Sequence, residues 1–467
     1  MIQLPEIFVQ YTREMMGEER FSLFLQAFNE EPPATIRINP LKCYFMPHSY
    51  QCRVPWCNTG FYLESRPPFT FDPLLHAGLY YVQEASSMFI HEVLRQHVTE
   101  PSLVLDLCAA PGGKSTAART ILPNGSALIC NEPVRQRAQV LAENIQKFGH
   151  RDVIVTNNFP KDFQKTRLQF DAILADVPCS GEGMFRRDEG AIHEWSPQNV
   201  ERCWQLQRTI VSDIWPQLKP GGLLVYSTCT FNTLENEQNV QWICNELGAD
   251  VVPVKPRFDW NLTRSLLDGF RMPVYRFIPG ITRGEGLFVA VLRKKGEASQ
   301  RSTFNVQRPA FNVQRSTSFN VHHWLNGDFD IFPVGDQLRA LPTTPLMLQA
   351  YHAVSQSLKV LHAGITLGTL RGKDLIPHES LALAAAFNKQ LFPRAELTYA
   401  QAISYLRGES LTLSPYVPHG FVAVTFHDIP LGFVKNIGTR ANNLYPQEWR
   451  IKTTHLPEEE PKILDIQ

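Results

Sequence analysis

The stretch LVLDLCAAPGGKST occupies residues 103–116 and passes from strand-forming to turn-forming to helix-forming residues. Its apolar start fits a strand buried in a parallel sheet. In an open α/β sheet, ligands bind outside the carboxyl ends of the strands. Small residues let the backbone approach a ligand closely, and a helix N-terminus offers free N–H donors. We therefore predict a ligand-binding loop formed by Cys108, Ala109, Ala110, Pro111, Gly112, Gly113 and Lys114.

Downstream of this loop, apolar segments alternate with helical ones. Helical patterns such as the one at 135–148 separate short apolar runs, which occur at residues 127–130, 153–155, 171–176, 222–226 and 287–292. This alternation is typical of a mostly parallel sheet that is covered by helices on both faces. We expect an α/β domain over residues 101–295.

The flanking regions differ in composition from this domain. Residues 1–100 begin with an amphipathic helical stretch over 1–30 and continue as short extended runs, which indicates a small α+β accessory region. Residues 296–322 contain the sequence FNVQR twice, and we interpret them as a duplicated linker. Residues 323–467 are expected to form one or two α+β modules, with strands in 362–370 and 420–435 and a helix over 380–387.

Length and composition exclude several classes of protein. At ~150 residues per domain, 467 residues correspond to about three domains. A hydrophobic content of 43% with 19% charged residues excludes a disordered chain. Lys+Arg and Asp+Glu both number 45, which excludes a globally basic surface but leaves room for a local basic channel.

The sequence also bears on location. No apolar run approaches the ~18–20 residues of a membrane span, and residues 1–20 lack the pattern of a secretory signal. Nine cysteines, an odd number scattered along the chain, argue against a disulfide framework and fit a reducing cytosol. We expect a cytoplasmic, monomeric protein without a membrane partner.

Three ligands compete for the loop at 108–114. A phosphate-binding P-loop needs glycine where Cys108 stands, and Pro111 removes a backbone donor. A dinucleotide fingerprint needs three glycines that are absent. S-adenosylmethionine has no phosphate and needs a tight backbone contact at its amino-acid end. Glu132 stands 19 positions after Gly113, where it would either accept hydrogen bonds from the ribose of S-adenosylmethionine or be a solvated turn residue. Arg137 would either reach the cofactor or be exposed.

Two cysteines follow neighbouring predicted strands. DVPCSGEG at 176–183 contains Cys179, and STCTF at 227–231 contains Cys229. Carbon C5 of a cytosine or uracil is too weak a nucleophile to take a methyl group directly. A thiolate that adds to C6 turns the ring into an enamine whose C5 can attack a sulfonium methyl. Asp176 could hydrogen-bond the amino and N3 edge of a cytosine, and strand-end spacing leaves open which cysteine is the nucleophile.

The remaining cysteines outside the loop are interpreted as buried small hydrophobes. Their spacings form no paired ligand set, so we expect no zinc or other metal. They are Cys43, Cys52, Cys57, Cys130, Cys203 and Cys244.

With these motifs, the sequence resembles the RNA cytosine-5 methyltransferases of the Nop2/Sun family, and most closely their bacterial 16S rRNA methyltransferase F branch. The resemblance implies a Rossmann-like methyltransferase domain, an N-terminal RNA-binding region and a C-terminal RNA-binding PUA-like region. It is carried by residues 106–116, DVPCSGEGMFRRD at 176–188, WSP at 195–197, YSTCTF at 226–231, ENE at 235–237, RIN at 37–39, YVQEASSM at 81–88 and, for the PUA-like region, 431–446.

This resemblance implies roles for individual residues. Cys229 would be the nucleophile, Cys179 would assist product release and Asp176 would hold the base. S-adenosylmethionine would contact residues 108–114, Glu132 and Arg137, and also Asp176. Many relatives carry an acidic residue near adenine after the third strand, whereas this chain has Asn157-Asn158-Phe159, so an adenine contact from Asn158 is open.

The implied partner is small-subunit rRNA or the 30S subunit. Residues 255–315 contain twelve Lys or Arg against four acidic residues, a net charge of +8, which fits phosphate contacts or a solvated basic linker. Phe185, Arg186 and Arg187 are candidates for stacking on and reading a flipped-out base near Cys179.

Two other functions were weighed against the methyltransferase. Gly113-Lys114-Ser115 also fits a P-loop-like NTPase acting on RNA, which would bind ATP and no sulfonium ligand. A non-catalytic RNA-binding or ribosome-assembly factor would keep the fold without methyl transfer, and the intact pair of cysteines argues against it.

Overall fold

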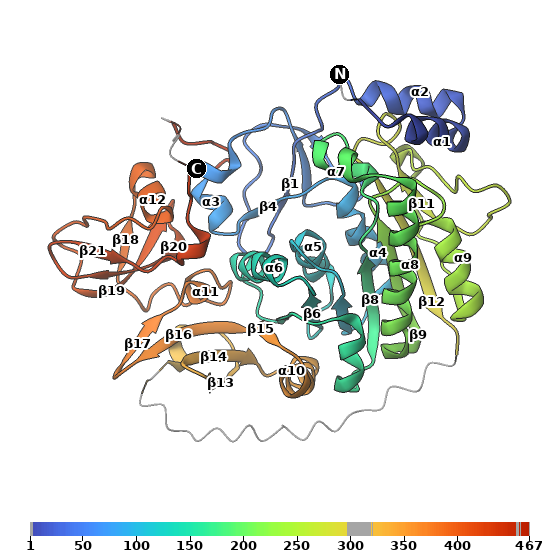
Figure 1. Cartoon of the computed structure of the whole chain (residues 1–467). Helices are drawn as coiled ribbons and strands as arrows, with labels where there is room; N and C mark the ends of the chain where they lie inside the picture. The colour runs from blue at the N-terminus through green and yellow to red at the C-terminus, as the bar shows by residue number, and fades with distance from the viewer. Residues whose placement is uncertain (1–2, 297–318, 320, 454–456, 458, 467) are drawn as a thin grey trace.

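A nine-stranded sheet lies at the centre of the computed structural model, which describes residues 3–296, 319, 321–453, 457 and 459–466. The spatial order is β10-β12-β9-β8-β5-β6-β7-β15, and β11 pairs with β12 (Figure 1). The pairs formed within the set β5 to β9 are all parallel. The pairs that involve β10, β11, β12 or β15 are antiparallel. The expected mixed, mostly parallel sheet is thereby confirmed. The strands are β5 (Leu103–Asp106), β6 (Ala127–Asn131), β7 (Val153–Thr156), β8 (Phe170–Asp176), β9 (Leu218–Thr228), β10 (Ala249–Val251), β11 (Tyr275–Phe277), β12 (Leu287–Lys294) and β15 (Val360–Ala363).

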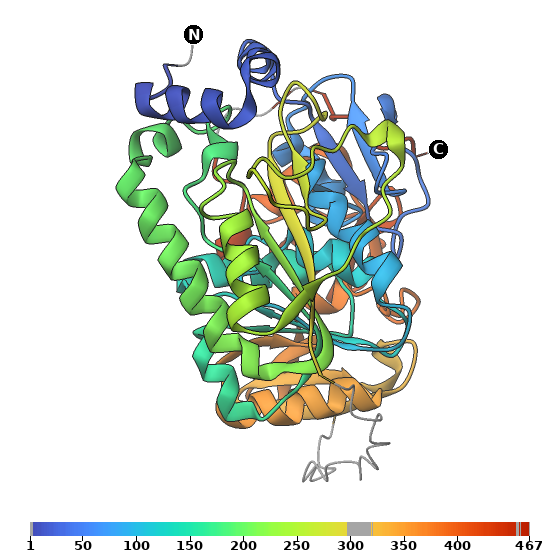
Figure 2. The same ribbon diagram turned by 90° about the vertical axis from the view of Figure 1, so that its right-hand side faces the viewer.

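Helices cover both faces of this sheet because successive side chains of each strand point to opposite sides. Leu103 and Leu105 pack into one apolar cluster, and Val104 packs into the other. Figure 2 views the molecule from the side of α8 and α9. The first cluster is covered by α8 (Pro197–Ile214), α9 (Glu237–Glu246) and α10 (Pro345–Ser357), and the second by α4 (Ile90–His97), α5 (Gly113–Ile121) and α6 (Arg135–Phe148).

The N-terminal region contains a helix pair and a small antiparallel sheet. The amphipathic stretch expected over residues 1–30 is helical but divides at Gly17, whose φ of 76° ends the first helix. The sheet order is β2-β3-β1-β4. The elements are α1 (Glu6–Met16), α2 (Glu18–Ala27), β1 (Thr35–Ile38), β2 (Tyr50–Arg53), β3 (Gly60–Leu63), α3 (Pro73–His76) and β4 (Tyr80–Val82).

The chain after the linker forms two four-stranded sheets and contributes β15 to the central sheet (Figure 1). The FNVQR repeat at 304–308 and 311–315 lies outside the described residues. The elements of the two sheets and the helices beside them are β13 (Phe329–Val334), β14 (Gln337–Pro342), β16 (Ile365–Arg371), β17 (Asp374–Pro377), α11 (Glu379–Ala382), β18 (Arg394–Glu396), α12 (Tyr399–Leu406), β19 (Gly420–Phe426), β20 (Ile429–Asn436) and β21 (Ala441–Asn443).

The helix predicted over residues 380–387 is wrong beyond Ala382, where α11 ends. Two backbone groups of the following residues bond to distant segments. The Ala385 N–H donates to the Gly149 carbonyl at 3.0 Å, and the Ala386 carbonyl accepts from the Asn326 N–H at 2.8 Å. These contacts replace helical hydrogen bonds, so tertiary pairing overrides the helix propensity of the alanines.

None of the helices in the described part of the chain is both long and apolar enough to cross a bilayer. Near the sheet edge the most deeply buried ion pair joins Arg276 of β11 to Glu237 at the start of α9. Both side chains are at most 1% exposed, and Arg276 Nε lies 2.9 Å from a Glu237 oxygen. Arg276 also donates to the Phe231 carbonyl at 2.6 Å.

Removing one partner of this pair should destabilise the fold strongly, because the other charge would stay buried without compensation. We expect Glu237→Gln to lower the free energy of unfolding by about 3–5 kcal/mol, measured from urea unfolding curves. The control is Asp250→Asn, which breaks the exposed Asp250–Lys295 pair and should change stability by less than about 0.5 kcal/mol. Equal effects of the two substitutions would contradict this assignment.

Candidate active site

The two cysteines predicted to meet at one sheet edge do so. Cys179 follows the end of β8, Cys229 follows the end of β9, and these strands are parallel neighbours with Asp176 opposite Ser227. The two Sγ atoms are 3.2 Å apart, and both side chains are half-buried. At this distance one thiol can donate a hydrogen bond to the other sulfur.

The surroundings of Cys179 disfavour its thiolate form. The hydrogen bond to Cys229, together with burial, raises the pKa of the Cys179 thiol well above its ordinary value. Cys179 therefore keeps its proton and can donate it in a hydrogen bond to a thiolate on Cys229. The arrangement is a thiol beside a potential nucleophile.

Lys114 extends from the loop at 108–114 to Asp176 and lies near enough to Cys229 for the two charges to interact. Its Nζ lies 2.8 Å from Asp176 Oδ2, while Ser227 Oγ donates to Asp176 Oδ1 at 2.7 Å. Burial opposes the charge of Lys114, but attraction to Asp176, and then to Cys229 and Asp106, outweighs it and raises the pKa of the ammonium group. A fixed positive charge therefore faces the cysteine pair.

The predicted ligand-binding loop joins β5 to α5. Gly112, with a φ of 114°, precedes the first residue of α5, a backbone conformation that residues with a Cβ rarely adopt. The Ala109 N–H donates to the Asn131 carbonyl at 2.8 Å, which ties the loop to the end of β6. Cys108 is 8% exposed, and burial, then the nearby Glu132, raises the pKa of its thiol. Cys108 therefore keeps a neutral thiol and packs as part of the loop at 108–114.

Two buried carboxylates beside this loop have an oxygen without a partner among the described residues. Glu132 is 1% exposed, its Oε1 accepts from the Val134 N–H at 2.9 Å, and its Oε2 has no hydrogen bond. Asp106 Oδ2 accepts from Ser115 Oγ at 2.6 Å, and its Oδ1 has none. Burial raises the pKa of Asp106 to about 7. Orphaned buried acceptors fit a ligand that brings hydroxyl or amino donors.

Arg137 lies at the rim of this site. Its Nη2 donates to the Ala110 carbonyl at 3.0 Å and lies 3.6 Å from Glu132 Oε2, while about half of its side chain is exposed. The exposure expected as one possibility is found, while the contact of Arg137 with the cofactor stays a prediction. Arg137 shapes the loop and is also solvated.

The adenine contact left open for Asn158 stays a prediction, and both polar atoms of its amide bond to Lys359. Asn158 Nδ2 donates to the Lys359 carbonyl at 3.1 Å, and Asn158 Oδ1 accepts from the Lys359 N–H at 3.0 Å. Both ends of the amide are used to hold the residue that precedes β15.

The expectation that Phe185, Arg186 and Arg187 read a base near Cys179 is wrong for Phe185. Phe185 is 1% exposed and packs edge-on against Phe8 of α1 at a ring-centroid distance of 5.1 Å. Arg187 forms an ion pair with Glu285. Only Arg186 lines an open cavity. The N-terminal helices thus cover the aromatic side chain that the local sequence left free.

Sequence reasoning missed the role of two buried glutamates that connect the cysteine loops. Glu235 accepts from the Ser180 N–H at 3.1 Å and from Asn232 Nδ2 at 2.7 Å. Glu182 accepts from the backbone N–H groups of Phe231 and Asn232 at 2.7 and 3.0 Å. The sequence signal for this role is a carboxylate inside a loop of small residues, which also forms part of the family motif.

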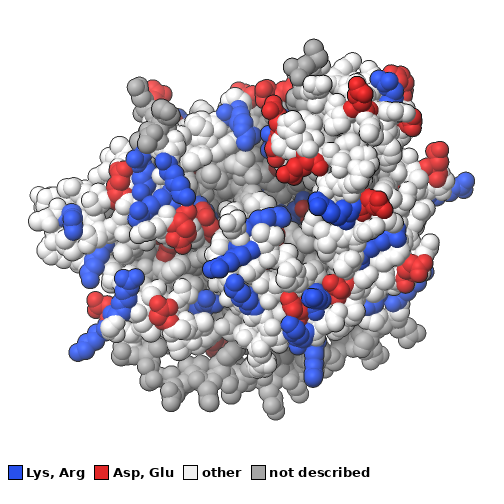
Figure 3. All heavy atoms as spheres, in the orientation of Figure 1, with Lys and Arg blue, Asp and Glu red and all other residues white. Residues whose placement is uncertain are grey.

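The basic segment 255–315 is only partly available for RNA. Arg276 is buried in its ion pair, and Lys294 donates to the Trp215 and Leu218 carbonyls, each at 2.9 Å. Residues 297–318 lie outside the described part of the chain. Acidic and basic side chains are interspersed on the face shown in Figure 3. Among the described residues, no three His, Cys, Asp or Glu side chains come together as metal ligands would.

Three family models match the chain. They are 16S rRNA methyltransferase RsmB/F over residues 93–293, the N-terminal domain of 16S rRNA methyltransferase RsmF over 4–85, and the methyltransferase RsmF PUA domain over 392–451.

Named proteins and solved structures are similar as well. The chain is 31% identical over 484 residues to ribosomal RNA small subunit methyltransferase F of Escherichia coli, and 29% identical over 485 residues to that of Klebsiella pneumoniae. Each alignment covers 96% of both chains. A crystal structure of a methyltransferase homologue from Pyrococcus horikoshii is similar at a TM-score of 0.53 and 27% identity, over 63% of this chain and 96% of that one.

The carboxyl group of Glu235 should make stability depend on pH. Burial, then the neighbouring Glu182, raises the pKa of Glu235 to about 7. The folded protein thus binds this proton more tightly than the unfolded chain, and the resulting stabilisation is lost as the pH rises to about 7. Glu235→Gln lacks this group. The melting temperature of the wild type minus that of the variant should therefore fall by about 2 °C or more between pH 5 and 7.5, and a constant difference would contradict it.

Proposed function

Since the chain belongs to the family of the ribosomal RNA small subunit methyltransferases F, we propose that it methylates C5 of a cytosine in 16S rRNA with S-adenosylmethionine as methyl donor. The observation that supports the cytosine chemistry is the contact of 3.2 Å between Cys179 and Cys229 beside the Lys114–Asp176 pair. Family membership also argues against the NTPase hypothesis. None of the contacts described above for the loop at 108–114 supports that hypothesis.

We assign the nucleophile to Cys229. Its thiolate adds to C6 of the cytosine, so that a C–S bond forms and C5 becomes electron-rich. The Lys114 ammonium and the Cys179 thiol face this sulfur and stabilise its negative charge before addition. Bound S-adenosylmethionine supplies the electrophilic methyl group. A general base then takes the proton from C5, the C5–H electrons restore the C5=C6 double bond, and the C–S bond breaks with its electrons returning to Cys229.

Cys179 is proposed to assist this last step. Its high pKa keeps a proton on Sγ, and a hydrogen bond to the departing sulfur makes Cys229 a better leaving group. Without Cys179 the elimination would slow and the covalent RNA intermediate would accumulate. The two cysteines therefore differ in role, although they lie at equivalent strand ends.

Asp176 is proposed to hold the base. Both of its oxygens are engaged, with Lys114 and Ser227, but each carboxylate oxygen has a second lone pair. It can therefore accept from the cytosine amino group while Lys114 stays bound. Ser227 fixes the orientation of the carboxylate.

The loop at 108–114, Glu132 and Arg137 are proposed to bind the methyl donor. Glu132 Oε2 supports this assignment, because it accepts no hydrogen bond from the described residues and a ribose hydroxyl would supply one. Within this loop, the Lys114 ammonium group also bonds to Asp176, which links the proposed methyl-donor site to the carboxylate proposed to hold the base.

The RNA partner is proposed to contact three regions. We keep the expected boundaries, with an N-terminal RNA-binding region at 1–100, the catalytic domain at 101–295 and an RNA-binding PUA-like region at 323–467. Small-subunit rRNA, free or in the 30S subunit, is the proposed substrate, and a monomer in the cytoplasm is the proposed state.

Substitution of each cysteine should give a different outcome. We expect Cys229→Ala to reduce incorporation of labelled methyl groups into 16S rRNA to the level without enzyme. Cys179→Ala should instead accumulate a protein–RNA adduct that survives denaturing electrophoresis.

Two further variants serve as controls for this experiment. Cys179→Ala/Cys229→Ala should form no adduct, and Cys244→Ala, a third half-buried cysteine, should keep activity within about twofold. An active Cys229→Ala protein, or an adduct in the double variant, would refute the assignment.

The cofactor site can be tested by binding alone. Glu132→Gln should weaken S-adenosylmethionine binding by about tenfold or more in titration calorimetry, because a hydrogen bond to a charged group contributes about 1.5–3 kcal/mol. Glu143→Gln on α6, whose carboxylate pairs with Lys147, should leave the Kd unchanged. Unaltered affinity in the Glu132 variant would show that the ribose lies elsewhere.

A further inference from the structure

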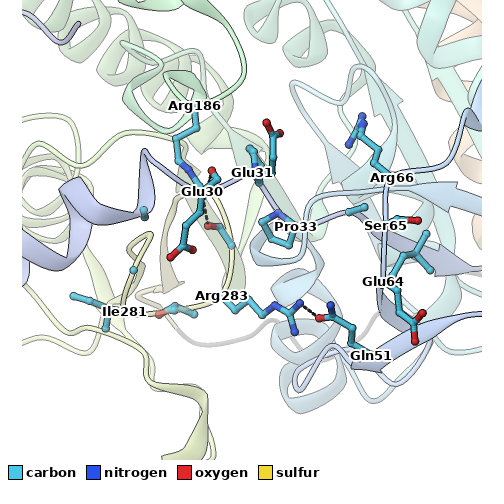
Figure 4. Close-up of a pocket in the computed structure, with 17 residues that line it drawn as sticks. Glu30, Glu31, Pro33, Gln51, Glu64, Ser65, Arg66, Arg186, Ile281 and Arg283 are labelled. Atoms are coloured by element: carbon cyan, nitrogen blue, oxygen red, sulfur yellow. Dashed lines mark hydrogen bonds between the residues drawn. The ribbon is translucent and has the colours of Figure 1, made fainter. Parts of the chain in front are cut away.

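A cavity of about 780 Å³ lies beside the catalytic loops and outside the residues assigned above (Figure 4). Its walls come from the segment after α2, from residues that follow β3, from residues 280–284, and from Arg186. Cavities of ~300–1,000 Å³ are of the size that holds small ligands. This one has room for a nucleotide.

The cavity is connected to the cysteine loops through both of its catalytic-domain walls. Arg186 follows Cys179 by seven residues in the same loop. The other wall continues to Gly286, where an added Cβ would lie 2.7 Å from the Phe231 ring and 3.2 Å from Gly183 Cα. The Gly183 N–H in turn donates to the Cys229 carbonyl at 2.7 Å. A nucleotide in the cavity would thus be a close neighbour of a base at the cysteines.

Three guanidinium groups from separate segments line this space. Arg186 donates to the Glu30 carbonyl at 2.9 Å and has a buried Nε without a partner in the described structure. Arg283 stacks on the Tyr62 ring at 4.2 Å and donates to Gln51, and Arg66 is exposed elsewhere in the lining. Guanidinium groups that line one cavity can bind the phosphates of RNA.

The same cavity also contains carboxylates, which a site for phosphate alone would exclude. Glu30, Glu31 and Glu64 are exposed, and within the described chain their carboxylates form no hydrogen bond or ion pair. In Figure 4 the Glu30 carboxylate lies between Arg186 and Arg283. A carboxylate accepts hydrogen bonds from the exocyclic amino group of a base, and proteins read unpaired RNA bases by such edge contacts.

On the basis of the proposed function, we propose that this cavity binds the nucleotide directly beside the target cytosine. Arg66, Arg186 and Arg283 hold its phosphates. Glu30 or Glu31 accepts a hydrogen bond from the amino group of adenine, guanine or cytosine. Uracil offers only its N3–H, which lies between two carbonyl oxygens that repel a carboxylate. It therefore binds less well than a base with an amino group, and the cavity selects the sequence around the methylated position.

The test combines an RNA change with a protein change. Bisulfite sequencing first maps the cytosine that the wild-type protein methylates in 16S rRNA from cells that lack it. Transcripts are then made with the preceding or the following nucleotide replaced by uridine, and kcat/KM is measured for the wild type and for Glu30→Gln/Glu31→Gln. Glu19→Gln, an exposed change on α2, is the control.

For the wild type and for Glu19→Gln, uridine on one side should lower kcat/KM about tenfold. For Glu30→Gln/Glu31→Gln, whose amides also offer N–H donors, the loss should be less than about twofold. A disturbed RNA fold would affect all three proteins equally, so equal losses of kcat/KM would overturn the inference. No loss of kcat/KM in the wild type would also overturn it. So would a natural methylation site that has uridine on both sides of the cytosine. If the wild type methylates no cytosine in 16S rRNA, the proposed function itself fails.

Discussion

The parallel pairing of β8 with β9 is the constraint on which the site depends. Hydrogen bonds between adjacent parallel strands fix Asp176 opposite Ser227, and the chain then has only a few residues in which to place Cys179 and Cys229. The sulfur contact follows from this register. A slip by one residue would turn each side chain to the opposite face of the sheet. Burial on both faces of the sheet prevents such a slip, because each strand packs into an apolar cluster on either side.

The loops beyond these strands are held by buried polar groups rather than by apolar packing. Glu182 and Glu235 are at most 1% exposed, and their oxygens are surrounded by N–H donors. Buried carboxylates are costly unless fully hydrogen-bonded, so they define a single loop conformation. The reaction proposed for Cys229 needs such definition, since a reactive sulfur must be placed within a fraction of an ångström.

Local sequence predicted most of the central sheet and the turn from strand to helix at 107–112, because strand periodicity and small residues act over short distances. It could not predict the environment of Phe185, which depends on α1, or that of Asn158, which bonds to a residue 201 positions away. The helix expected over 380–387 failed for the same reason. The cysteine pair was predictable because parallel strands with a known order bring their ends together. The partner of Lys114 was not, since a long flexible side chain has several acceptors within reach.

The position of β15 has a consequence for how the chain can be divided. The polypeptide leaves the central sheet near one side at β12 and contributes β15 on the far side of β7. A fragment that stopped at residue 296 would retain Cys179, Cys229 and the whole loop at 108–114. It would also expose β7 as an edge strand whose unpaired backbone N–H and C=O groups can pair with strands of other chains. The segment that completes the sheet therefore acts as a protective cap against self-association of the catalytic half.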